Sequence, residues 1–251
     1  MTIMSTVIDW NKYKQASDDE KIQMLKDGAE KGDALCQLGY GCVLFERDSL
    51  TEARRWFELS VNQGLDLAKH ALAFVLPSQE RPRPLLLLRE IAEKGCVSSM
   101  FALGMEYERY SEEGRIPNYL RAMECYLNVI SSQDDSDWLQ SQLGALFESE
   151  IFDILFLDRE SLIGAAEYRL GMMYLDGNGV DQNPQTALDW LKKSSDHENW
   201  NGRYTLGYIL AKGAYCIERD KEKARQLLEE LLDDPDEHKE EKLRYALSLC
   251  E

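Results

Sequence analysis

The sequence predicts an all-α fold, an α–α superhelix of about six helix–turn–helix repeats. Three observations support this prediction. Single glycines recur about every 32 residues, a Leu-Gly pair recurs at a similar interval, and strand signals are nearly absent. Self-similarity with a period of about 20–50 residues is typical of repeat architectures, in which each unit buries its apolar face against its neighbours.

The recurring glycines mark the ends of predicted helices. Gly32, Gly64 and Gly95 are 32 and 31 residues apart, and the four residues that end at Gly32 recur identically before Gly95. Each glycine follows an amphipathic segment. Glycine adopts the left-handed conformation that ends a helix without steric cost. We therefore predict a helix end at each of these positions.

The Leu-Gly pairs lie inside apolar-periodic segments instead of at their ends. They stand at Leu38-Gly39, Leu103-Gly104, Leu143-Gly144, Leu170-Gly171 and Leu206-Gly207, with Leu72-Ala73 as a variant. From Gly39 to Gly207 there are 168 residues in five intervals, or 33.6 on average. A glycine in a helix interior costs about 1 kcal/mol relative to alanine. We expect a partner helix to approach closely at these glycines.

A second helix is predicted after each Leu-Gly segment, and its start is marked by capping residues. Ser49-x-x-Glu52 has the capping-box pattern, and Asn183-Pro184 places a cap before a proline at the first helical position. Asp220 is placed to cap the helix that carries Ala224. Ser17-x-x-Glu20 opens a similar helix near the N-terminus.

The segment 166–180, which reads AEYRLGMMYLDGNGV, and the following 187–191 strongly resemble the Sel-one-like repeat family. Residues 200–230 resemble it too, whereas the copies near Gly39 and Gly104 are degenerate and the copy near Ala73 is the weakest. Residues 131–164 depart most from the pattern. The resemblance implies a right-handed solenoid over residues 28–232. Residues 1–27 are then an N-terminal capping segment, and residues 233–251 an acidic linker with a C-terminal capping helix.

The resemblance also implies which residues face the concave side of the solenoid: those two before each Leu and one after each Gly. The candidate partner-binding residues are Tyr40, His70, Phe74, Phe101, Met105, Tyr168, Met172, Tyr204 and Tyr208, and the same rule selects Cys36, Ser141 and Ala145. Most are aromatic or methionine, which are enriched in protein-recognition surfaces. Packing between adjacent helices is an equally valid interpretation of each. Tyr204 and Tyr208 fit a groove best, because a phenol tolerates water.

Composition and charge exclude several kinds of partner. The 251 residues contain 29 Lys and Arg against 46 Asp and Glu, a formal net charge of −17. Nucleic acids and anionic membranes require a basic surface, so neither is expected. The acidic segment 229–241 is typical of a solvated face or loop, and the alternative is that it steers a basic protein partner toward the chain. The sequence has no apolar run of about 18 residues and no signal-peptide pattern. We therefore expect a cytoplasmic protein.

Patterns of catalytic or metal-binding residues are not found in the sequence. The six cysteines form no Cys-x-x-Cys motif and the three histidines are far apart, so no metal site or cofactor is predicted. Gly177-x-Gly179 follows a helix and has no third glycine, which indicates a loop and not a nucleotide site. Cys36 and His70 are the only Cys–His pair expected to face one groove. We expect reduced, mostly buried cysteines.

The leading hypothesis is a non-enzymatic protein-binding module, whose narrower form is an immunity protein that masks a toxin. Some proteins that resemble this family are found beside secreted toxins. The alternative is a hydrolase of β-lactam-like compounds, as implied by cysteine-rich relatives, although the paired cysteines of those relatives are missing here. A nucleic-acid reader built on helical repeats is disfavoured by the net charge.

Overall fold

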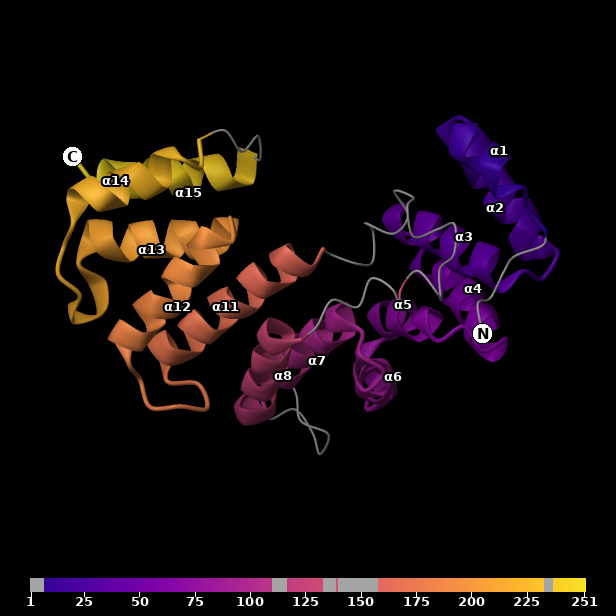
Figure 1. The fold of residues 1–251 in the computed structure, drawn as a ribbon, viewed down its shortest axis with the longest axis horizontal. Helices are drawn as coiled ribbons and strands as arrows, with labels where there is room; N and C mark the ends of the chain where they lie inside the picture. The colour runs from indigo at the N-terminus through magenta and orange to yellow at the C-terminus, as the bar shows by residue number, and fades with distance from the viewer. Residues whose placement is uncertain (1–6, 110–116, 133–138, 140–157, 233–236) are drawn as a thin grey trace. The chain divides into compact units, whose positions relative to one another are not determined.

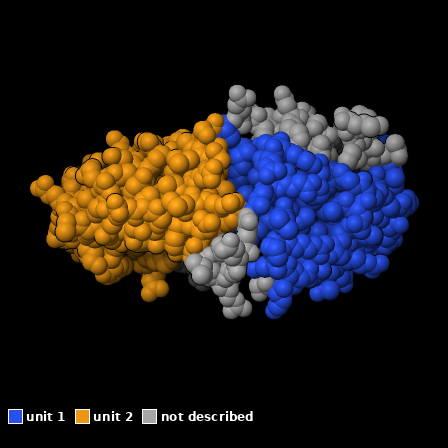
Figure 2. All heavy atoms as spheres, turned by 90° about the horizontal axis from the view of Figure 1, so that it is seen from below, with its two compact units in different colours: residues 1–106, 112–114, 132–158 blue, residues 107–111, 115–131, 159–251 orange. Residues whose placement is uncertain are grey.

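The computed structural model describes the chain except for residues 1–6, 110–116, 133–138, 140–157 and 233–236. The described residues contain thirteen α-helices and two short 3₁₀ helices, and no strand. The chain divides into two compact units, which Figure 2 colours separately. Unit 1 contains residues 1–106, 112–114 and 132–158, and unit 2 contains residues 107–111, 115–131 and 159–251. The predicted all-α class is confirmed.

Unit 1 contains a succession of antiparallel helices joined by short turns (Figure 1). They are α1 (Trp10–Gln15), α2 (Asp18–Glu30), α3 (Ala34–Glu46), α4 (Leu50–Asn62), α5 (Leu67–Val75), η1 (Ser78–Glu80), α6 (Arg83–Ala92) and most of α7 (Val97–Arg109). Each helix from α2 to α6 packs against the next. Their core includes Leu25, Phe57 and Leu72, which are fully buried.

Unit 2 continues the same pattern. Its helices are α8 (Tyr119–Ser131), α11 (Arg159–Asp176), α12 (Pro184–Asp196), α13 (Trp200–Lys212), η3 (Ala214–Cys216), α14 (Lys221–Glu229) and α15 (Glu237–Ser248). The first helices of successive pairs, α11, α13 and α15, also contact one another, so they form one layer. α8 packs against α11 although residues 132–158 separate them in the sequence.

The predicted helix ends are confirmed. Gly32, Gly64 and Gly95 follow α2, α4 and α6 with φ of 90°, 86° and 101°, a conformation that costs other residues energy. These glycines have open space around them, so the backbone conformation alone explains them.

The prediction that Leu-Gly glycines allow close helix packing is confirmed in unit 2. A Cβ added at Gly171 would lie 2.9 Å from Leu191 of α12, and one added at Gly207 would lie 2.8 Å from Leu228 of α14. In unit 1 a close approach is found at Gly41, which is not one of the predicted Leu-Gly glycines: a Cβ added there would lie 2.5 Å from the ring of Phe57 on α4. In every case the glycine lets the second helix approach the first.

Three of the four predicted caps form as expected. The Asn183 side chain accepts a hydrogen bond from the Thr186 amide, and Asp220 accepts one from the Lys223 amide. Glu20 closes its capping box by accepting from the Ser17 backbone N–H at 3.0 Å. The box at Ser49 was predicted wrongly: among the described residues, its side chain makes no capping hydrogen bond. Its ψ of 57° departs from the extended conformation that directs a cap side chain toward the helix amides.

Candidate protein-binding surface

Three aromatic side chains form a stack along one face of α13. Trp200, Tyr204 and Tyr208 are four residues apart, so they lie on successive turns of the helix. The Trp200 and Tyr204 ring centroids are 5.0 Å apart with an interplanar angle of 10°, and those of Tyr204 and Tyr208 are 6.2 Å apart at 17°. All three rings are half-buried, packed against the core of unit 2. We call these three residues the aromatic ladder.

Two lysines and a fourth ring border the aromatic ladder. The Lys239 Nζ lies 5.0 Å from the centroid of Trp200, and the Lys212 Nζ lies 5.4 Å from that of Tyr208. The ring centroid of Tyr245 on α15 lies 6.5 Å from that of Tyr208, and Tyr245 is 55% exposed. A lysine side chain therefore lies against the ring at each end of the ladder.

Hydrogen bonding and burial set the ionisation of the ladder's polar groups. The Lys212 Nζ donates to the Tyr208 hydroxyl oxygen at 3.1 Å, and this bond raises the pKa of Lys212. Burial raises the pKa of Tyr204, and the neighbouring Tyr208 and Tyr245 add to the effect. Both shifts favour the neutral phenol of Tyr204 and the charged ammonium group of Lys212.

The candidate residues on α11 lie on the first-helix layer as well. Tyr168 and Met172 are half-buried and pack against the same core cluster as the aromatic ladder. Four of the nine candidates, two on α11 and two on α13, are therefore partly exposed in unit 2. Trp200 lies outside the offsets from the Leu-Gly pairs that select the candidates, although its four-residue spacing from Tyr204 is visible in the sequence. Tyr245 and Lys239 belong to α15, and only the packing of that helix brings them to Tyr208 and Trp200.

The candidates in unit 1 have more varied environments. Phe74 is 46% exposed and Tyr40 and Met105 are half-buried, whereas Phe101 is buried. His70 is 1% exposed, and its Nδ1 lies 2.8 Å from the Ser99 Oγ. Tyr40 packs edge-on against Trp56 of α4. Cys36 is fully buried, and Ser141 and Ala145 lie outside the described residues. The structure therefore places His70 and Phe101 among packing residues.

The Cys–His pairing considered for catalysis has a different arrangement in the structure. His70 is paired with Ser99, whose hydroxyl donates to the Cys96 Sγ at 3.3 Å. All three side chains are at most 1% exposed. A substrate has no access to a group buried in this way, so the cluster supports the packing of α5 on α7. The six cysteines, all within the described residues, form no disulfide, and four of them are buried.

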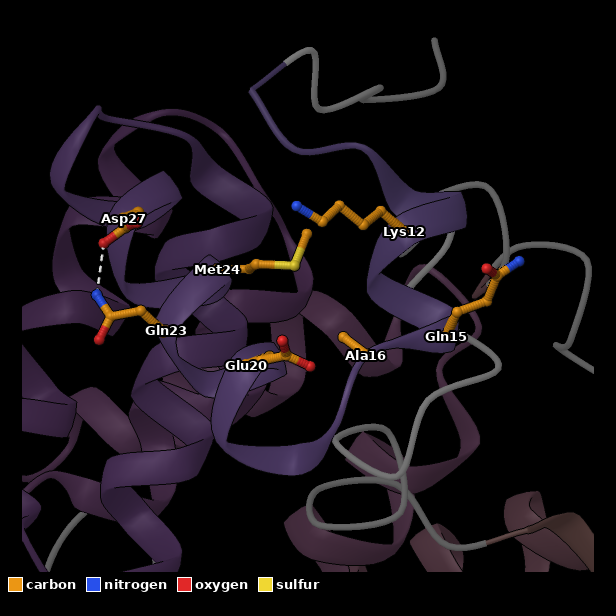
Figure 3. A pocket seen from close by; sticks show the side chains of 7 residues that line it. All are labelled: Lys12, Gln15, Ala16, Glu20, Gln23, Met24 and Asp27. Atoms are coloured by element: carbon orange, nitrogen blue, oxygen red, sulfur yellow. Dashed lines mark hydrogen bonds between the residues drawn. The ribbon is translucent and has the colours of Figure 1, made fainter.

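Metal-binding clusters, membrane-spanning helices and surface hollows are the other features considered in the described part of the chain. No cluster of three or more His, Cys, Asp or Glu there could hold a metal ion. None of the described helices is long and apolar enough to cross a membrane. A hollow of about 320 Å³ lies between α1 and α2 (Figure 3). The two acidic side chains that line it make hydrogen bonds within α2 or at its start. Glu20 completes the capping box of the helix, and the Asp27 carboxylate accepts a hydrogen bond from the Gln23 side chain at 2.6 Å.

Comparison with known proteins identifies the family. Residues 32–65, 97–127, 164–199 and 201–233, together more than half of the chain, match the Sel1 repeat. The chain belongs to the Sel1 repeat family, whose members are typically scaffolds for protein–protein interaction. The weak copy near Ala73 is not among the matches, and of the divergent segment 131–164 only Gly164 is matched.

Solved structures show the same fold. The chain is similar to a Sel1 repeat protein from Oxalobacter formigenes, with 20% identity, a TM-score of 0.62, and coverage of 91% of this chain and 84% of that one. It is also similar to a protective antigen of uropathogenic Escherichia coli with the SLR fold, with 22% identity and a TM-score of 0.50. That match covers 95% of this chain, which spans 55% of the antigen's length. The α–α solenoid class is thereby confirmed.

Proposed function

We propose that the chain is a non-enzymatic binding module that holds a protein partner on the first-helix face of unit 2. The observation that carries the proposal is the aromatic ladder, extended by Tyr245 and by Tyr168 and Met172. Half-exposed aromatic side chains on a rigid helix lose little conformational entropy on binding, and they are enriched among the residues that dominate interface energetics. The helices beneath them are held by a continuous core, so the surface is formed before a partner arrives.

The catalytic alternative has less support. The one His–Ser–Cys cluster among the described residues is fully buried. Burial also raises the pKa of Cys42 far above the usual range for a thiol, which removes its nucleophilic thiolate form. We therefore favour recognition over hydrolysis.

The proposal is tested by affinity capture followed by measurement of binding to the purified partner. A Tyr204→Ala/Tyr208→Ala double variant is expected to weaken the partner's Kd by at least about tenfold, because aromatic hot spots contribute about 2 kcal/mol each. Leu120→Ala on α8, where the leucine is 68% exposed, is the control and is expected to leave Kd unchanged. Equal Kd values for the double variant and the native chain would refute this location of the binding surface.

A narrower form of the proposal is an immunity protein that neutralises a basic toxin. Its support is the net charge of −17, which favours association with a basic partner. Much of this charge lies outside the described helices, since residues 132–158 contain seven Asp or Glu and no Lys or Arg. Co-expression with a candidate toxin gene from the same locus tests this form. Failure to restore growth would leave the general binding proposal intact.

A further inference from the structure

Unit 2 contains two Asn-Gly dipeptides in different surroundings. Asn178-Gly179 lies in the loop between α11 and α12, which spans residues 177–183, and Asn201-Gly202 lies in the first turn of α13. Asn-Gly is the dipeptide most prone to deamidation, because glycine has no Cβ to keep its backbone nitrogen away from the asparagine side chain. The same reactive sequence is therefore held in two conformations.

In the loop dipeptide the two reacting groups are unrestrained. The Gly179 N–H donates no hydrogen bond to the residues that the structure describes, and the Asn178 side chain makes none with them. Only the backbone N–H of Asn178 is held, since it donates to the Met173 carbonyl at 2.9 Å. Gly179 is exposed, with a φ of 76°. The Gly179 nitrogen and the Asn178 side chain therefore give up no hydrogen bond within this part of the chain when they meet.

The helical dipeptide lacks that freedom. The Gly202 N–H donates at 3.0 Å to the Oδ1 of Asn199, which is the N-cap of α13. A Cβ added at Gly202 would overlap the Ser194 hydroxyl of α12, so this glycine is closely packed. A succinimide ring between Asn201 and the Gly202 nitrogen requires a ψ outside the helical range. The first turn of α13 must therefore open before Asn201 reacts.

We infer that Asn178 is a site of spontaneous deamidation to aspartate and isoaspartate, whereas Asn201 is protected by its helix. The Gly179 nitrogen loses its proton and attacks the Cγ of Asn178. The Cγ–Nδ2 bond breaks, and the side-chain amide leaves with a proton as ammonia. One water molecule then opens the succinimide ring at either carbonyl carbon, which gives aspartate or isoaspartate.

The conversion also changes how the loop packs on α8. A Cβ added at Gly179 would lie 2.7 Å from the Cβ of Tyr119 and 3.1 Å from its carbonyl carbon, so the loop backbone lies directly against the start of α8. Isoaspartate inserts an additional methylene group into the backbone immediately before Gly179. Because the contact with Tyr119 has no spare room, the longer backbone moves Gly179 away from it and loosens the first turn of α8.

Peptide mapping of the full chain tests the inference. The native chain is incubated at mildly alkaline pH, which favours the deprotonated nitrogen, and is digested with trypsin at intervals. Trypsin places Asn178 and Asn201 on separate peptides, residues 170–192 and 194–203. Mass spectrometry measures the replacement of amide by acid, and an isoaspartyl methyltransferase labels isoaspartate. We expect Asn178 to react at least about tenfold faster than Asn201, because α13 must open locally.

Urea provides the matched control, because it removes the structure and keeps the sequence. In urea the two asparagines are expected to react at similar rates, since each precedes a glycine. Asn178→Gln removes the loop site and Asn201→Gln the helical site, so these variants assign each change in mass. The same ratio of rates in the native chain as in urea would overturn the inference. So would a native Asn178 that stays intact over the time in which it converts in urea.

Hydrogen exchange tests the effect on α8. The Arg121 and Ala122 amides donate to the side chain and the carbonyl of Asn118, so they report on the first turn of the helix. We expect both amides to exchange faster in the isoaspartate form, separated by ion exchange, than in the unconverted chain. Asn178→Asp adds the charge without lengthening the backbone and is expected to change exchange less. Unchanged exchange at both amides in the isoaspartate form would refute the loosening of α8.

Discussion

The same sequence rule selects candidate residues on helices α5 and α13, but the structure gives these side chains different environments. Both carry aromatic candidates at the same offsets from their Leu-Gly or Leu-Ala pair: His70 and Phe74 on α5, Tyr204 and Tyr208 on α13. On α5 the first position is buried against Ser99 of α7 and only Phe74 stays exposed. On α13 both rings are half-exposed, and Tyr204 stacks between Trp200 and Tyr208. A repeat position thus defines the direction of a side chain, and the neighbouring helix decides whether that side chain is buried or partly exposed.

The largest expected effect tests whether the two units unfold independently of each other. Phe57 in unit 1 and Leu191 in unit 2 are fully buried against the glycine-bearing helices. We expect Phe57→Ala to destabilise unit 1 by about 3–5 kcal/mol and Leu191→Ala to destabilise unit 2 by about 2–5 kcal/mol, because each leaves a cavity.

Urea unfolding of each variant, followed by hydrogen exchange, measures where stability is lost. Leu59→Ala on α4 is the control, because Leu59 is 37% exposed and is expected to contribute less than about 1 kcal/mol. Equal loss of amide protection in both units for either core variant would show that they unfold together.

A smaller effect is expected when the ring is removed at the two equivalent positions, His70 and Tyr204. His70→Ala removes a buried ring and leaves the Ser99 hydroxyl without its imidazole partner, so we expect a loss of about 2–4 kcal/mol in the free energy of unfolding. Tyr204→Ala removes a half-exposed ring and is expected to cost less than about 2 kcal/mol. Thermal or urea denaturation of both variants measures the difference. A greater loss of unfolding free energy for Tyr204→Ala would mean that the aromatic ladder mainly stabilises the fold.

The smallest effect depends on pH and concerns the contact between α11 and α12. The Glu167 side chain is 4% exposed, and its Oε2 lies 2.7 Å from the His197 Nδ1. Burial raises the pKa of Glu167, and the hydrogen bond to His197 partly opposes this shift. A carboxyl with a raised pKa in the folded state favours folding when protonated. Its contribution is therefore fully present below the unfolded-state pKa and is lost as pH rises through the folded-state pKa.

Glu167→Gln tests this linkage. Glutamine keeps the size of the side chain and a hydrogen-bond acceptor for His197, but it does not titrate. We expect the stability of the glutamine variant, measured relative to the native chain by urea unfolding, to rise as the pH is raised from about 4 through the folded-state pKa of Glu167. Glu160→Gln is the control, because Glu160 is 67% exposed at the same histidine and should change the pH profile little. A constant stability difference over this range would contradict the assignment.

The sequence alone determined the repeat and most of its local structure. Helix ends at Gly32, Gly64 and Gly95 follow from backbone sterics, and the caps at Asn183 and Asp220 follow from side-chain hydrogen bonding over three residues. Such interactions span one helical turn, so they can be read from neighbouring residues. The Ser49 box failed because its backbone conformation depends on the turn between α3 and α4.

Only the tertiary structure decided which candidate residues are exposed and how the ladder is completed. His70 is buried because α7 brings Ser99 to it across 29 residues, and Tyr208 meets Tyr245 because α15 packs on α13. The division into two units likewise has no sequence marker. Burial depends on the sum of contacts from helices distant in the sequence, whereas helix formation depends on residues within a few positions of one another.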